Sequence, residues 1–317
     1  MLQHQTEFEV MSDYIIPTNI TTIADRCFEN CEKLSKVIIN PSLVHIGISS
    51  FGNCTELTGI TLSTSLTTIG ANAFESCIHL RSVILPTSLL ELGPSTFKNC
   101  EYLQEIEIPQ HIRHISDSCF EHCLRLTSVK LPMVKYISDY AFKDCGQLQT
   151  ISLPPSIRSI GRGCFENCAN LKSIHLPPNI AIIHDTTFAR CFNLVDCIIG
   201  EHVSVIKCQA FYDCSKLGSL RVPKGLKMIE HNAFNTCMKV VCGNVEYDLN
   251  DDYYNEEQNL IASITINPDP KVVQRLEIKL QILYNFVDLQ TFEIEFPKLR
   301  NMISTRQKTW AETLMMR

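Results

Sequence analysis

The sequence lacks the features that would place a chain across a membrane or on nucleic acid. No stretch of eighteen consecutive apolar residues occurs, as a transmembrane helix would need. Lysine and arginine number 28 against 34 acidic residues. The resulting net charge of -6 disfavours nonspecific electrostatic binding to nucleic acid or to an anionic membrane. Residues 1–14 show no basic-then-apolar pattern of a secretory signal. We therefore expect no membrane span and no nucleic-acid partner, and we expect a cytoplasmic location.

Recognisable catalytic and cofactor motifs are missing as well. There is no Ser-His-Asp grouping, no phosphate loop and no nucleotide fingerprint. Cys-x-x-x-Cys pairs do occur, at Cys27/Cys31, Cys119/Cys123 and Cys164/Cys168. Zinc sites normally need two compact pairs, and one member of each pair here belongs to a fixed repeat position. We predict a non-enzymatic chain with no catalytic residue, no metal site and no cofactor.

What the sequence does contain is one motif in ten copies. The clearest copy runs from Phe165 to Pro177 and reads F-x-x-C-x-x-L-x-x-I-x-L-P. Successive copies are 23 residues apart, except for one step of 22 residues. The phenylalanines are Phe28, Phe51, Phe74, Phe97, Phe120, Phe142, Phe165, Phe188, Phe211 and Phe234. A period kept over so many copies is typical of a solenoid, in which each unit buries its apolar face against its neighbours.

Each copy contains two kinds of apolar pattern. The F-x-x-C-x-x-L stretch has three-residue spacing, which favours a helical turn. The run after it alternates, as in residues 83–85 and 151–153, and this alternation predicts a short strand. The fold class we predict is an α/β-type repeat solenoid of ten units of about 23 residues, with parallel strands and short helical turns.

Ten of the sixteen cysteines share the position three residues after the phenylalanine. In a stack of repeats they would form a column about 5 Å apart, which is the spacing of strands. Parallel side chains in such a column do not face one another as a disulfide requires. Because cysteine also behaves as a small buried apolar group, we predict reduced, structural thiols.

The full pattern I-x-x-I-(G)-x-x-x-F-x-x-C-x-x-L-x-x-I-x-L-P resembles the BspA-type leucine-rich repeats, which occur in bacterial surface antigens and are expanded in some protists. The resemblance covers residues 17–245 and weakens in the last copy, where Val240, Gly243 and Glu246 replace the usual Leu, Ile and Pro. It implies a curved leucine-rich-repeat solenoid used for protein recognition, in some members at a cell surface. It implies no catalytic residue.

Flanking segments differ from the repeats. We divide the chain into an N-terminal cap (1–17), the repeat domain (18–245) and a third segment (246–317) that begins as an acidic linker. In that segment we expect a strand and then helices starting near Pro270 and Pro297. The segment is either a cap on the last repeats or a docking element, and the cap is the interpretation we prefer because the end of a solenoid needs cover.

Positions that the repeat leaves variable are the candidates for binding. Residues eight and ten after each phenylalanine should point outward from the strands. The partner-binding candidates among them are Glu105, Glu107, Lys130, His175, Ile198 and Arg221.

Two further rows are expected six and seven residues before the phenylalanine. Seven residues before it lies a basic stripe of Arg113, Lys135 and Arg158, and six residues before it lies an apolar stripe of Ile182, Val205 and Met228. We expect the C-terminal segment or a partner to cover the apolar stripe. The alternative for all of these positions is a solvated surface without a ligand.

Three functions fit these observations. The first is a scaffold that binds a protein partner inside the cell. The second is a cell-surface adhesin exported without a standard signal, as the resemblance allows. The third is an arm that regulates or targets a partner through its C-terminal tail.

Overall fold

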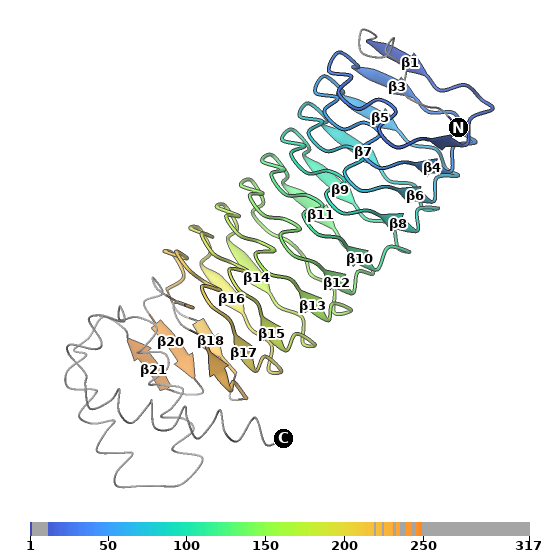
Figure 1. The fold of residues 1–317 in the computed structure, drawn as a ribbon. Helices are drawn as coiled ribbons and strands as arrows, with labels where there is room; N and C mark the ends of the chain where they lie inside the picture. Colours follow the sequence, from blue (N-terminus) through green and yellow to red (C-terminus); the bar gives the residue numbers. More distant parts are fainter. Residues whose placement is uncertain are drawn as a thin grey trace, which may run out of the picture.

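The protein is a coil of short parallel strands arranged in two rows (Figure 1). The computed structural model describes residues 1, 12–218, 220–223, 225–230, 233–234, 239–242 and 245–248. Over these residues the strands are two to four residues long and no helix is present. Each turn of the coil is one repeat of the sequence, so the expected repeat solenoid is confirmed.

The first row consists mainly of three-residue strands. They are β1 (Asp13–Ile15), β3 (Lys36–Ile38), β5 (Gly59–Thr61), β7 (Ser82–Ile84), β9 (Glu105–Glu107), β11 (Ser128–Lys130), β14 (Ser173–His175), β16 (Asp196–Ile198) and β18 (Leu220–Val222). The register advances by one repeat per strand, as in the pairs Lys36↔Gly59 and Gly59↔Ser82. In most of these strands the middle residue is buried and the outer two face water. In the repeat that follows the 22-residue step, the strand is reduced to a single bridge between Thr150 and Ser173.

The second row consists of two-residue strands. They are β2 (Thr22–Ile23), β4 (His45–Ile46), β6 (Thr68–Ile69), β8 (Glu91–Leu92), β10 (His114–Ile115), β12 (Tyr136–Ile137), β13 (Ser159–Ile160), β15 (Ile182–Ile183), β17 (Val205–Ile206) and β19 (Met228–Ile229). The second residue of each strand is buried, and the first lies on the surface or only partly covered. Because the two rows pair separately, the coil presents two distinct outward faces.

The helical turn predicted for F-x-x-C-x-x-L is wrong. From Phe28 to Phe211, the residues two before and two after each phenylalanine adopt positive φ, for example 52° at Ser118 and 61° at His122. A left-handed residue at both positions prevents a right-handed helix from continuing. The backbone instead bonds to the next repeat, where Phe120 N donates to the Ala141 oxygen at 2.8 Å. This segment is therefore a third hydrogen-bonded side of the coil.

Replacing Ser95 with valine should test the cost of the left-handed positions. Ser95 has a φ of 53°, and a β-branched side chain is strongly disfavoured there. We expect Ser95→Val to lower the free energy of unfolding by about 1–2 kcal/mol in urea denaturation. The matched control is Ser82→Val in β7, on the exposed side of an extended strand, which should change it by less than about 0.5 kcal/mol. Equal effects of the two substitutions would contradict the argument.

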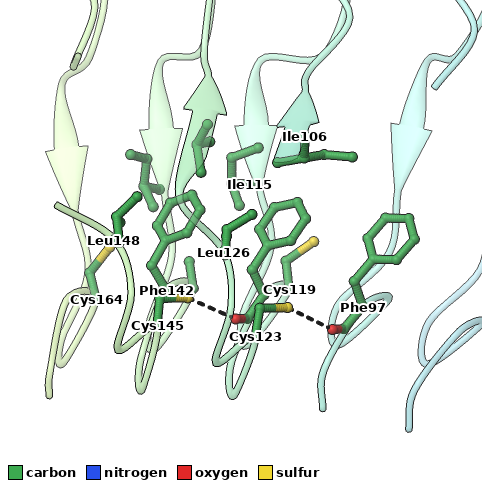
Figure 2. Close-up of a cluster of buried hydrophobic side chains, with 14 of the residues drawn as sticks. Phe97, Ile106, Ile115, Cys119, Cys123, Leu126, Phe142, Cys145, Leu148 and Cys164 are labelled. Carbon is green, nitrogen blue, oxygen red and sulfur yellow. Dashed lines mark hydrogen bonds between the residues drawn. The ribbon is translucent and has the colours of Figure 1, made fainter. Parts of the chain in front are cut away.

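A single column of phenylalanine rings forms the centre of the core. All ten rings, from Phe28 to Phe234, are buried. Neighbouring ring centroids are 5.1–5.7 Å apart and the rings lie nearly parallel along most of the column. Figure 2 shows the rings of Phe97 and Phe142 pointing the same way, with Leu126, Leu148 and the isoleucines beside them. The buried rings, leucines and isoleucines supply the burial that offsets the entropy of ordering the chain.

The cysteine column is bonded to the backbone rather than to itself. The thiol of Cys123 donates to the carbonyl oxygen of Phe97 in the preceding repeat at 3.2 Å, and Cys145 does the same to Phe120 (Figure 2). The same bond recurs at Cys54, Cys77, Cys100, Cys168, Cys191 and Cys214. The nine described cysteines of the column, from Cys31 to Cys214, are buried free thiols, as predicted.

Both ends of the described array extend its first row. At the N-terminal end β1 pairs with β3, Ile16 is buried, and the Tyr14 ring lies 5.3 Å from the ring of Phe28. At the other end β20 (Lys239–Cys242) pairs parallel with β18, and β21 (Val245–Asp248) returns antiparallel to β20. Glu246, where we expected an acidic linker to start, lies in β21 opposite Val241. The helices expected near Pro270 and Pro297 lie outside the described residues.

Candidate binding surfaces

The face of the first row carries a line of exposed isoleucines at its N-terminal end. Ile15, Ile38, Thr61 and Ile84 are successive partners in the strand register. The isoleucines are 67%, 46% and 81% exposed, respectively. Our sequence-based candidates omitted this line, although the spacing that selects Ile198 also selects Ile38 and Ile84.

Glu105, Glu107 and Lys130 lie immediately beyond that line, on β9 and β11. Lys130 is the register partner of Glu107, and its Nζ lies 2.9 Å from Glu107 Oε2. The hydrogen bond from Lys130 to Glu107 raises the pKa of the lysine above its ordinary value. Both side chains are about two-thirds exposed, so the pair contributes little to stability. Glu105, on the same strand, adds an exposed negative charge beside the pair.

His175, Ile198 and Arg221 form a separate group further along the same face. His175 and Ile198 are register partners on β14 and β16, and Arg221 is exposed on β18. Ile198 is 50% exposed, and His175 Nε2 lies 3.7 Å from Asp196 Oδ2. The six predicted partner-binding residues therefore share one face but form two groups, separated by the repeat in which the strand is reduced to a bridge.

The second face carries the basic stripe. Arg113, Lys135 and Arg158 are exposed just before β10, β12 and β13. Their backbones are stacked, because Lys135 N donates to the Arg113 oxygen and Arg158 N to the Lys135 oxygen, each at 2.8 Å. Arg113 Nη1 also donates to the Met133 oxygen at 3.0 Å. The alignment expected from the sequence is thus present.

The apolar stripe continues the second face beyond the basic one. Ile182, Val205 and Met228 are register partners on β15, β17 and β19. Ile182 is 37% exposed, while Val205 and Met228 are half-buried. The C-terminal segment that we expected to cover them lies outside the described residues.

A hollow of about 470 Å³ lies beside the basic stripe. Its lining residues are His114, Tyr136, Ile137, Ser138, Asp139, Ser159, Gly161 and His184. His114 Nε2 and Ser138 Oγ are 2.6 Å apart. Small residues at Ser159 and Gly161, next to the larger Tyr136 and His184, account for the depression. Sequence reasoning missed this hollow because the size of the side chain at its lining positions varies from repeat to repeat and follows no motif.

Three possible metal ligands meet on the third side of the coil. Donor atoms of Glu121, His122 and Asp144 lie within 4.8 Å of one another. His122 Nδ1 is 3.0 Å from Asp144 Oδ2, and Lys98 Nζ is 3.0 Å from Glu121. Burial pushes the pKa of Glu121 up, but hydrogen bonds from Ser118 and Lys98 outweigh it, and the net pKa is lowered.

Within this cluster, Glu121 is paired with Lys98 and Asp144 is paired with His122, so neither carboxylate needs a metal ion as a partner. The nearby Cys119 and Cys123 are buried, whereas His122 is exposed and faces Asp144. The two thiols and the imidazole therefore do not gather into one site.

Comparison with known proteins now identifies the array. A profile described as "BspA type Leucine rich repeat region (6 copies)" matches residues 9–127 and 113–241, which together make up most of the chain. The chain belongs to the BspA-type leucine-rich repeat family. The resemblance seen in the sequence is therefore confirmed for this repeat protein.

Solved structures agree on the fold of this BspA-type protein. A leucine-rich repeat protein from Bacteroides ovatus is 25% identical, with a TM-score of 0.53 over 74% of this chain and 75% of that one. A leucine rich cell surface protein from Faecalibacterium prausnitzii is 22% identical, with a TM-score of 0.52 over 73% of this chain and 81% of that one. A search of curated proteins finds no match.

Among the described residues, no helix has the length and apolar character to cross a membrane.

Proposed function

We propose that this BspA-type repeat protein is a non-enzymatic scaffold that binds a protein through the face of its first strand row. The observation that carries the proposal is the line of exposed isoleucines at Ile15, Ile38 and Ile84. Covering one such side chain in a complex would gain about 1.5–3 kcal/mol, whereas leaving it in water gains nothing for the fold. Aligned exposed apolar side chains favour a docking surface over a solvated one.

The charges beside this line fit the edge of such a surface. Interfaces combine an apolar centre with a polar, solvated rim. Glu105 and the Glu107–Lys130 pair border the isoleucine line on β9 and β11. Ile198, with His175 and Arg221 beside it, offers a smaller second contact on the same face. A partner long enough to cover both groups would follow the axis of the coil.

A photo-crosslinking amino acid at Thr61 tests this proposal in the native cell. Thr61 lies between Ile38 and Ile84 in the register. We expect a discrete crosslinked species at Thr61 whose yield falls about tenfold or more when Ile38 and Ile84 are both changed to aspartate, because two apolar contacts worth about 1.5–3 kcal/mol each are lost.

The matched control places the same probe at Thr67, which immediately precedes β6 in the second strand row. A crosslink that forms equally from Thr67, or that survives the double aspartate substitution, would contradict binding through the first row.

We also propose that the protein acts inside the cell. The free thiols at every described cysteine support this location, because exported proteins often oxidise theirs. Labelling intact native cells with a membrane-impermeant amine reagent should leave the protein unmodified, while lysed cells should yield labelled protein. Labelling in intact cells would instead establish the surface-adhesin alternative.

A further inference from the structure

We propose that the second face of the coil, over β10, β12 and β13, binds an acidic peptide segment. Its carboxylates would pair with Arg113, Lys135 and Arg158, and its backbone would lie along the hollow beside them. This site is separate from the isoleucine-lined face and does not depend on the function proposed above.

Spacing of the three cations indicates the shape of the ligand. They precede consecutive strands, and strands in a sheet are about 4.8 Å apart, so the outer two backbones are about 10 Å apart. A single carboxylate or phosphate cannot reach all three. An extended peptide rises about 3.3 Å per residue and turns every second side chain to one face, so alternating acids, about 6.6 Å and about 13 Å apart, bracket this span and lie within reach of the long cationic side chains. The stripe therefore favours a short run of acids over one small anion.

Within the described residues these three cations have no acidic partner, as is also true of Lys33, Lys36 and Arg81, and what sets the three apart is that they stand in one row on consecutive repeats. By contrast, Lys98, Lys130, Lys143 and Lys207 each have a carboxylate within 4 Å. An unneutralised row of three charges in a protein of net charge -6 is complementary to a local cluster of acids.

The hollow adds groups that suit a peptide rather than a nucleic acid. Tyr136 is 45% exposed and meets the His114 ring edge-on, with centroids 6.5 Å apart. Ser138 and Ser159 supply hydroxyls that can bond a peptide backbone. Asp139, at one side, accepts a bond from Arg162 N and would direct a ligand's acids away toward the stripe. A single exposed aromatic and three cations give a nucleic acid little to stack on or pair with.

Fluorescence anisotropy on the full chain tests the site. The probe is a fluorescein-labelled peptide of alternating glutamate and serine, at about 50 mM salt so that surface charges are weakly screened. We expect the triple variant Arg113→Glu, Lys135→Glu, Arg158→Glu to bind the peptide about tenfold or more weakly, since each exposed pair contributes a few-fold and reversal adds repulsion. The triple variant Lys33→Glu, Lys36→Glu, Arg81→Glu has the same net charge at other exposed positions and should stay within about twofold of the wild type.

A second variant separates the hollow from bulk charge. Ser159→Trp fills the hollow without changing charge and should weaken binding about threefold or more, with an unchanged melting temperature. Equal loss in the two charge variants, or equal binding of a glutamine–serine peptide, would overturn the proposal. So would tighter binding of a single-stranded oligonucleotide that depends on the same three cations, because the ligand class would then be wrong.

Discussion

Raising the pH from 8 to 10 under reducing conditions should unfold the repeat array. Burial raises the pKa of eleven thiols, to about 12 at Cys27. The others are Cys54, Cys77, Cys100, Cys119, Cys123, Cys145, Cys164, Cys168, Cys191 and Cys208. An unfolded cysteine loses its proton near pH 8.5, while these buried thiols keep theirs.

The sign and size of the effect follow from proton binding. Above about pH 8.5 the folded chain holds more protons than the unfolded chain, so the free energy of unfolding falls as pH rises. Below that pH the contribution of the thiols is fully present. Each fully buried thiol contributes at most about 1.4 kcal/mol per pH unit, the partly exposed Cys208 contributes less, and a typical protein has only about 5–15 kcal/mol to lose. A column of such groups therefore makes the fold alkali-sensitive.

Urea denaturation followed by circular dichroism between pH 7 and pH 10 measures this slope. Lysine and tyrosine also titrate there, so the control is the double variant Cys123→Ala, Cys145→Ala. We expect its slope to be shallower by two protons, which is about 2.7 kcal/mol per pH unit. A slope identical to that of the wild type, or stability independent of pH across this range, would contradict the argument.

Replacing Phe120 with alanine should be the most damaging single substitution in the centre of the array. Its ring is fully buried between Phe97 and Phe142, with centroid distances of 5.7 Å and 5.4 Å. Losing a buried phenylalanine costs about 3–5 kcal/mol, from lost transfer energy and the cavity left behind. Since each repeat contacts mainly its neighbours, hydrogen exchange should speed up most in the repeats of Phe97, Phe120 and Phe142.

Phe192→Ala is the matched control for that experiment. Phe192 is outside the column and 40% exposed, so its loss should lower the free energy of unfolding by about 1 kcal/mol or less. If both substitutions cost the same in urea denaturation, the stacked column is not the main support of the fold.

The period of the motif alone was enough to predict the columns. Phenylalanines 23 residues apart must occupy equivalent places in a solenoid, and so must the cysteines three residues after them. Alternation likewise predicted that the middle residue of β3, β7 and β9 is buried and its neighbours exposed. These features depend only on spacing along the chain.

The F-x-x-C-x-x-L stretch shows where spacing is insufficient. Its three-residue apolar period is compatible with a helical turn, but from Phe28 to Phe211 the backbone is left-handed on both sides of each phenylalanine. Residues as different as Ser118, Tyr140 and Arg190 occupy these positions, so no residue type signals the conformation. Hydrogen bonds to the next repeat, such as Phe120 N to the Ala141 oxygen, stabilise it, and such bonds exist only once repeats stack.

The sequence by itself determined the repeat, the family, the buried thiols and the rows of residues that share a face. Only the tertiary structure decided which outward side chains neutralise each other, as Glu107 and Lys130 do, and which stay unpaired within the described residues, as Arg113, Lys135 and Arg158 do. It also decided that small side chains beside Tyr136 leave a hollow. The physical reason is that core positions obey the period of the coil, whereas surface pairs and hollows depend on the directions and sizes of side chains in neighbouring turns, which no period constrains.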